Sequence, residues 1–570
     1  MYVQQVSPVG GSLAFSGLVA ALPLVVLFVL LGGFRVRAWL ASLVSLVIAL
    51  VIAVAVYAMP VGQALLAGSE GAVFGFYPIL WIVINALWIY QMTVRTGHFE
   101  VLRRSFGSVS DDQRVQAVII AFAFGALLEA LAGFGTPVAI CTIMLIALRF
   151  APIKAAVVAL VANTAPVAFG AIAVPITTLA KVTSLPEPVL GAMVGRQTPI
   201  LAVFVPFVLV ALVDGWRGVR ETWAVALAGG LVFAVAQFVT SNYVSLALTD
   251  IVASLLSAGA VVLLVRIRPP RHSVVEEPTP ASPVRETVSV GGGTGPDAGG
   301  TDTAPPPSAG GSDDADRVLD SRRDTVLAYM PYLIIIALFS LQQVPPVKAL
   351  LDAPTTKPNW PGLNIMKAPE LRSSSPKVDV TFKLDFFMAA GTILLVAGLL
   401  TMLVLRVSPR GGLAAYGQTL KLLATAIVTV MSVLALAYVM NFSGQTVTLG
   451  LVMAGAGGVF AVLSPILGWL GVAVTGSDTS SNSLFGALQV TAAKGAALNP
   501  LLLAAANSSG GVLGKMISPQ NLAIAASAVG LSGREGEIFR KVLPWSLLFL
   551  AGMCVLVFLQ STPVLSWMVP

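Results

Sequence analysis

The stretch FGALLEALAGFGTPVAI, residues 124–140, decides the fold of this chain. It places one acid, Glu129, in an otherwise apolar run from Val115 to Leu148, and the glycine- and proline-containing sequence GFGTP follows at 133–137. A carboxylate at the centre of a membrane helix costs about 2.5–3.5 kcal/mol unless it faces a protein interior or a wet cavity. The stretch therefore predicts a membrane helix that breaks beside a buried, functional acid.

The composition of the whole chain agrees with a membrane protein. Of its 570 residues, 57% are hydrophobic and 10% are charged, and the mean hydropathy is +0.90, whereas soluble domains carry about 25% charged residues. The net charge of +7 comes from short arginine clusters between apolar segments rather than from one basic stripe, so it indicates topology and not nucleic-acid binding. Placing these clusters in the cytoplasm puts both termini outside.

Apolar segments recur from Leu13 to Leu559, and several are too short or too rich in glycine and proline to cross alone. We expect an all-α polytopic membrane protein with about 14 transmembrane helices. Some of these helices should be discontinuous or re-entrant, because broken backbone at membrane depth survives only when it is buried or lines a cavity.

Two polar segments interrupt the apolar pattern. Residues 269–325 are rich in Pro, Gly, Ser and Thr, a composition that cannot bury enough surface to fold, and we expect a flexible cytoplasmic linker. The second segment, Val344 to Lys383, should lie outside, with a turn at Asn359–Gly362.

The regions around Glu129 and around a second lone acid, Asp478, resemble each other. Asn163 lies 30 residues after Gly133, and Asn507 lies 31 residues after Gly476. A shift of 344 residues also aligns apolar segments of the two halves, and the arginine pattern gives the halves opposite orientations. This predicts two inverted repeats, typical of secondary transporters. The predicted parts are a first repeat at 1–222, two connecting helices at 223–268, the linker at 269–325 and a second repeat at 326–570.

Inverted-repeat carriers bind substrate where discontinuous helices meet. We expect such breaks at 133–137, 163–166, 476–482 and 507–511, where small and hydroxyl residues collect. Glu129 and Asp478 are the candidates for proton coupling, although Asp478 could equally cap a helix that begins at Thr479. The candidate substrate-binding residues are polar residues in or near these breaks: Thr136, Asn163, Thr164, Thr479, Ser480, Ser481, Asn482, Asn507, Ser508 and Lys515. The cations closest in sequence to the breaks are Lys515, Arg196 and Lys181, and each could instead extend to the membrane interface.

Long blocks of this chain resemble the L-lactate permease family. They are LEALAGFGTPVAI at 128–140, VANTAPVAFGAIAVPI at 161–176, RQTPILAVFVPF at 196–207, VDGWRGVRETW at 213–223, TGSDTSSNSLFGALQ at 475–489 and ISPQNLAIAASAVGLSGREGEIFRK at 517–541. The resemblance implies uptake of L-lactate, D-lactate and glycolate with protons across a bacterial cytoplasmic membrane. It also groups the chain with ion transporters that are built from inverted repeats.

Other classes of protein fit the sequence less well. The two histidines, His98 and His272, lie in predicted loops, no cluster has metal-ligand spacing, and Cys141 and Cys554 lie in apolar segments. We therefore expect no enzyme activity, metal or cofactor. Sodium-coupled carboxylate transport is the main alternative, and a channel or a membrane-embedded enzyme is a weaker one. The sequence leaves the oligomeric state open, a homodimer included.

Overall fold

The computed structural model describes residues 1–269 and 321–570, apart from residues 35, 108, 132, 134, 343, 370–376, 532 and 533. Residues 270–320 of the predicted linker therefore lie outside the described part of the chain. The described residues are mostly helical, which confirms the all-α prediction. A two-residue parallel pair joins β1 (Tyr2–Val3) to β2 (Ile365–Met366).

The helices fall into two series joined by a connecting pair. The first series is α1 (Leu13–Phe28), α2 (Ala38–Ala55), α3 (Val61–Phe74), α4 (Trp81–Arg95), α5 (His98–Gly107), α6 (Gln113–Gln116), α7 (Gly125–Leu131), α8 (Thr136–Ala147), α9 (Pro152–Ala162), α10 (Gly170–Thr183), α11 (Glu187–Val194) and α12 (Thr198–Ala202). The connecting helices are α13 (Val205–Val239) and α14 (Thr249–Ile267). The second series is α15 (Arg322–Gln342), α16 (Pro345–Asp352), α17 (Ala390–Val404), α18 (Pro409–Ser443), α19 (Gln445–Ala454), α20 (Phe460–Thr475), α21 (Asp478–Gly495), α22 (Pro500–Gly514), α23 (Pro519–Ala528) and α24 (Glu535–Gln560).

Ten helical stretches of the described chain are long and apolar enough to cross a membrane, and the bent pair α9–α10 can make an eleventh. The predicted number of about 14 is not confirmed. One reason is that α8, α17 and α19 are apolar but short. Another is that Glu187–Val244 counts as a single stretch of 58 residues, although the backbone of α13 within it is non-helical at Asp214, Gly215 and Thr222.

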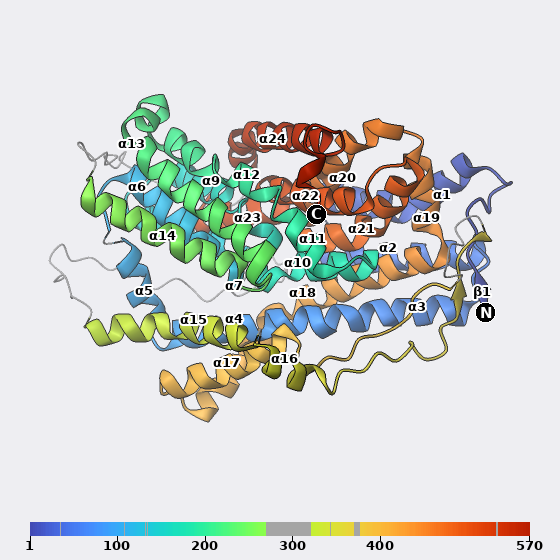
Figure 1. Cartoon of the computed structure of the whole chain (residues 1–570), viewed down its shortest axis with the longest axis horizontal. Coiled ribbons are helices and arrows are strands. Elements are labelled where there is room, and N and C mark those ends of the chain that lie inside the picture. The colour runs from blue at the N-terminus through green and yellow to red at the C-terminus, as the bar shows by residue number, and fades with distance from the viewer. Residues whose placement is uncertain are drawn as a thin grey trace, which may run out of the picture.

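A pair of long antiparallel helices forms the frame of the fold. Val61–Arg95, which contains α3 and α4, and Pro409–Ser443, which is α18, each have 35 residues and lie side by side along the molecule (Figure 1). Gly71 packs on the backbone of Leu434, whereas Trp88 donates a hydrogen bond to the carbonyl of Gly412 (2.9 Å). Residue numbers thus rise along one helix as they fall along the other.

The elements around this frame correspond in order and length. Leu13–Gly33 and Arg322–Gln342 each have 21 residues, and Gln113–Leu131 and Gly457–Thr475 each have 19. Contacts are exchanged between the halves, because α2 packs on α18 while α17 packs on α4. This arrangement supports two copies of one unit, and their inverted orientation and the predicted domain boundaries remain predictions.

Three of the four expected helix breaks are present. α7 ends at Leu131 and α8 begins at Thr136, with Gly133 and Gly135 at positive φ angles of 55° and 82°. The chain bends by 64° between α9 and α10. α20 ends before Gly476, whose φ of 75° is readily adopted only by glycine.

The break expected at 507–511 was wrong, because α22 is a continuous helix from Pro500 to Gly514. Its small residues allow close helix packing instead. A Cβ atom on Gly510 would lie 2.2 Å from the carbonyl oxygen of Pro465 in α20, so the two backbones nearly touch, as small residues permit between membrane helices. α22 ends later, at a 3₁₀ turn formed by Lys515–Ile517.

The polar segment after α16 lies against the first half of the chain. The predicted turn at Asn359–Gly362 is confirmed, since the amide of Leu363 donates to the carbonyl of Trp360 (3.2 Å) and Gly362 has a φ of 78°. β2 of this segment pairs with β1, so the N-terminus and this segment lie on the same side of the molecule.

The contact between α20 and α22 gives a test of the packing. A Cβ atom on Gly468 would lie 1.9 Å from the carbonyl oxygen of Asn507, so Gly468→Ala must push the two helices apart. We expect a loss of about 1–3 kcal/mol in unfolding free energy, the usual effect of overpacking. Thermal unfolding in detergent measures this change.

Gly417→Ala in α18 is the matched control, because a Cβ atom there has no neighbour within 4 Å. This control should be neutral or gain up to about 1 kcal/mol, since alanine favours helix more than glycine does. Unfolding of Gly468→Ala at or above the wild-type temperature would contradict the close approach of α20 and α22.

Candidate functional site

A cavity of about 560 Å³ is lined by both halves of the chain. This size is ordinary for a small-molecule site. Backbone and apolar side chains of the α10 region, including Gly170, Ala171 and Pro175, form one wall. The polar residues that line the cavity are Arg37, Glu129, Thr425, Thr429, Thr475, Ser477, Asp478, Thr479, Ser480, Lys515 and Gln520.

A buried ion pair lies in the cavity wall. The ammonium group of Lys515 donates to Oε1 of Glu129, and the two residues are only 6% and 3% exposed. Asn163 donates from Nδ2 to the other carboxylate oxygen, Oε2, at 3.2 Å. The structure thus brings together three predicted residues, one from each of three separate segments. It also places Lys515 in the protein interior rather than at a membrane interface.

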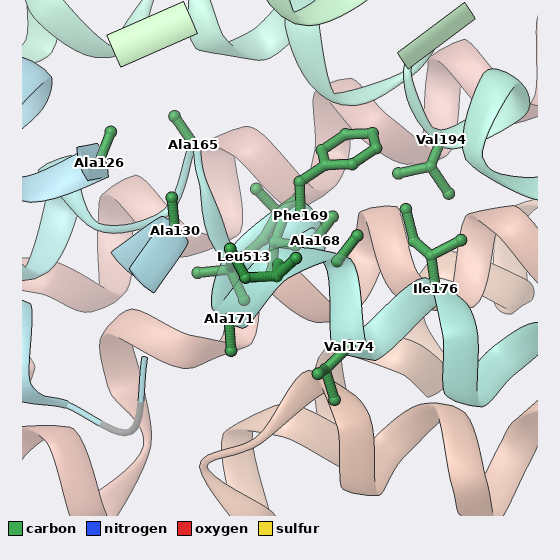
Figure 2. Packing of buried hydrophobic residues seen from close by; sticks show 14 of the residues in the cluster. Ala126, Ala130, Ala165, Ala168, Phe169, Ala171, Val174, Ile176, Val194 and Leu513 are labelled. Atoms are coloured by element: carbon green, nitrogen blue, oxygen red, sulfur yellow. The ribbon is translucent and has the colours of Figure 1, made fainter. Parts of the chain in front are cut away.

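Small residues hold Glu129 close to the broken segment between α9 and α10. α7 packs on α10, and Figure 2 shows Ala126 and Ala130 of α7 together with Ala165 of the break and Ala171 of α10. A Cβ atom on Gly170 would lie 3.0 Å from Oε1 of Glu129, so only a residue without a side chain leaves the carboxylate unhindered. The glycine therefore lets the backbone of the broken segment approach the carboxylate of Glu129 closely.

Asp478 lines the same cavity, at the start of α21. Its Oδ2 atom accepts hydrogen bonds from Ser508 (2.5 Å) and Asn482 (3.3 Å), while its Oδ1 atom has no partner in the described part of the chain. The alternative role as a helix cap was wrong, because Ser477 is the N-cap and accepts from the amide of Ser480. Asp478 is instead the first residue of the helix.

Several predicted residues belong to the hydrogen-bonded network around Asp478 and α21 and do not line the cavity. Asn507 donates to Asn482 (2.9 Å) and accepts from Gln489 (3.1 Å), which continues the network begun by Ser508. Ser481 donates to the carbonyl of Gly468 (3.2 Å) and so joins α21 to α20. These residues can position the acid without touching a ligand.

The remaining predicted residues divide into two groups. Thr479 and Ser480 line the cavity, as expected of substrate-binding residues. Thr164 instead lines a separate space of only about 10 Å³, and Thr136 is half-buried at the start of α8. Neither threonine is among the residues that line the large cavity.

Sequence reasoning missed some cavity residues. Arg37 belongs to an arginine cluster that indicated topology, and Gln520 lies in the first turn of α23, which had no predicted role. Thr475 and Ser477 flank Gly476, so their place in the helix break was a usable signal. The other two cations close to the predicted breaks lie elsewhere: Arg196 binds Asn242 (2.9 Å) and Lys181 binds the carbonyl of Thr381 (2.6 Å).

Comparisons with known proteins give relatives along nearly the whole chain. The glycolate permease GlcA of Escherichia coli (strain K12) is 40% identical over 569 residues and covers 98% of both chains. The L-lactate permease of Bacillus subtilis (strain 168) is 38% identical and covers 100% of both chains, and that of Escherichia coli (strain K12) is 40% identical over 98% of both. Among solved structures, the Alcanivorax borkumensis YdaH transporter aligns with 86% of each chain at 16% identity and a TM-score of 0.42.

The family model described as L-lactate permease matches residues 16–564. This range includes the cavity, the ion pair of Glu129 with Lys515, and the network around Asp478. The chain belongs to the L-lactate permease family.

Proposed function

We propose that this protein imports L-lactate, D-lactate and glycolate together with protons across the bacterial cytoplasmic membrane. The names of its relatives, L-lactate permease and glycolate permease, support this substrate class. The observation that carries the proposal is the buried ion pair of Glu129 with Lys515 in the wall of a cavity that both halves line.

Competition for Lys515 explains the coupling. With Glu129 ionised, its carboxylate neutralises the ammonium group, and a second carboxylate has no free cation to bind. A proton on Glu129 removes this negative charge, and Lys515 then becomes a charge-assisted donor for the substrate carboxylate. The substrate monoanion and the proton cross together without net charge, so each requires the other.

The start of α21 can recognise the rest of a 2-hydroxy acid. Ser477, Thr479 and Ser480 place hydroxyl groups on the cavity lining, where each can donate and accept hydrogen bonds. The N-terminal end of this 18-residue helix carries a partial positive charge that favours an anion. Asp478 can accept a hydrogen bond from a 2-hydroxyl group and is the second candidate for proton coupling.

Alternating access follows from the way the site is built. Its charged residues lie at helix breaks or beside them, whereas the frame of α3, α4 and α18 is long and is interrupted at Tyr77, between α3 and α4. We infer that the broken segments move relative to this frame and expose the cavity to each side in turn, as in other inverted-repeat carriers.

Sodium coupling fits this site less well than proton coupling. Sodium needs a shell of oxygen ligands, whereas the group that faces Glu129 is the ammonium of Lys515. A second cation next to this ammonium would be repelled.

Glu129→Gln tests the proton-coupling role. The amide cannot ionise, so we expect the variant to lose uphill uptake of labelled lactate driven by a pH gradient in proteoliposomes. Lactate counterflow at equal pH should continue in part, because exchange needs no net proton movement. A sodium gradient of the same size, tested on the wild type, separates the two forms of coupling.

Uphill accumulation by Glu129→Gln at the wild-type level would rule out the proposed role. Wild-type uptake that follows the sodium gradient and ignores the pH gradient would rule out proton coupling altogether. A channel in place of a carrier would show no stimulation of uptake by lactate on the opposite side.

Lys515→Met tests the substrate role of the ammonium group. Loss of a charge-assisted hydrogen bond removes about 1.5–3 kcal/mol of binding, so we expect KM for lactate to rise roughly 10- to 100-fold. Initial uptake rates over a range of lactate concentrations measure this. Arg196→Met is the control, since Arg196 does not line the cavity, and an unchanged KM in Lys515→Met would contradict the assignment.

A further inference from the structure

Asp250, at the start of α14, is a buried acid without a role in the proposed mechanism. It is 1% exposed. Its Oδ1 atom accepts a hydrogen bond from Nε2 of Gln237 at 2.9 Å, and its Oδ2 atom is buried with no partner among the described residues. It lies within the predicted connecting helices at 223–268 and was not among the predicted site residues.

The described part of the chain offers Asp250 no ion pair. The cations of the elements packed around α7 and α14 are engaged elsewhere: Lys154 with the carbonyl of Val213 (3.0 Å), Lys181 with that of Thr381 (2.6 Å), Arg95 with Gln418 (2.6 Å) and Lys515 with Glu129. The charged residues of α13 are Asp214, Arg217, Arg220 and Glu221. Asp214, Arg217 and Glu221 form ion pairs with Arg114 or with one another, whereas Arg220 and Arg266 of α14 are exposed. A carboxylate buried without a counter-charge is strongly unfavourable, so the group takes a proton.

Gln237 connects Asp250 to the break that carries Asn163. The same Nε2 atom that donates to Asp250 also donates to the carbonyl of Ala165 at 3.3 Å. Ala165 lies two residues after Asn163, whose side chain donates to Glu129. A continuous set of contacts therefore runs from Asp250 through the unwound backbone to the acid of the candidate site.

The charge state of Asp250 also matters for the site. Asp250 is near enough to Glu129 for the two acids to interact electrostatically, and α14 packs directly on α7. The other charged groups that line the cavity are Arg37, Lys515 and Asp478. An ionised Asp250 would repel the carboxylate of Glu129 and weaken its ion pair with Lys515. A neutral Asp250 leaves the two opposite charges of the ion pair undisturbed.

We propose that Asp250 is a positioning residue, held as a neutral carboxylic acid, which fixes the break between α9 and α10 through Gln237 and thereby orients Glu129. The inference rests on the proposed proton-coupling role of Glu129. It adds a residue from the connecting helices to a site otherwise built by the two repeats.

Substitutions that keep or remove the hydrogen-bonding shape test the inference. Asp250→Asn is neutral and can still accept from Gln237, so pH-driven lactate uptake should keep its wild-type rate and its wild-type pH of half-maximal activity. Asp250→Ala leaves a buried donor unpaired, and we expect its uptake rate to fall by about tenfold or more. Gln237→Met keeps the volume and Asp250 but removes the bridge, and should show the same loss even if Asp250→Ala does not fold.

Infrared spectroscopy reads the protonation state directly. The C=O stretch of a protonated carboxylic acid should be present in the wild type at about pH 8, far above the ordinary range of an aspartate, and should lose one component in Asp250→Asn. Glu187→Gln is the control in the uptake assay, because Glu187 accepts a hydrogen bond from Thr177 (2.7 Å) and does not line the cavity. It should leave uptake unchanged.

Three results would overturn the inference. One is a shift of the pH of half-maximal uptake toward acid in Asp250→Asn, because it would mean that an ionised Asp250 acts on Glu129. The others are an unchanged infrared spectrum in that variant, and wild-type uptake by both Asp250→Ala and Gln237→Met. Failure of the proposed function itself is seen separately, as wild-type uptake that ignores the pH gradient while the infrared result still stands.

Discussion

The ion pair of Glu129 with Lys515 is the interaction on which the rest of this structure depends. Its partners are 386 residues apart in sequence and are both buried. Removing one charge from a buried pair costs about 3–5 kcal/mol, because the other is left unpaired in a medium of low polarity. Protonation of the Glu129 carboxylate also removes one of the two charges, and it does so reversibly. The helix breaks, the glycines and the surrounding amides are needed to bring these two charges together and to leave space for a ligand beside them.

Small residues perform two different tasks around this pair, and the sequence shows both as the same pattern. At Gly133 and Gly476 the backbone adopts a positive φ and the helix ends. At Gly468 and Gly510 the helices continue, and the missing side chain lets α20 and α22 approach to backbone contact. The difference is set by the neighbouring helix rather than by the local sequence. For this reason the helix break expected at 507–511 is absent, whereas the break expected at 476–482 is present.

The parts of the site that the sequence predicts are local features, and the parts that it does not predict depend on contacts between distant segments. An acid in an apolar run, such as Glu129 or Asp478, is visible because its burial is costly and local sequence shows it. The partner of Glu129 could be named only as one of three nearby cations, since the pairing depends on contacts between distant segments. Asp250 was not predicted, because an acid in the first turn of a helix is common and favourable there, so its position alone does not indicate a role. The predicted number of about 14 crossings is not confirmed, because some apolar helices are short and others adjoin without a clear end, as within Glu187–Val244.

The two halves contribute different charges to the ion pair of Glu129 with Lys515, and this difference determines how the pair responds to movement of the halves. A shift of 344 residues places Ala473 opposite Glu129 and Ala171 opposite Lys515, and neither alanine carries a charge. Each half therefore contributes one charge of the pair. Had both charges been in one half, they would move together, and their interaction would be the same in every state of the carrier. Because one charge belongs to each half, a relative movement of the halves would act on the pair, and under the proposed mechanism the proton that cancels one charge would act on the movement.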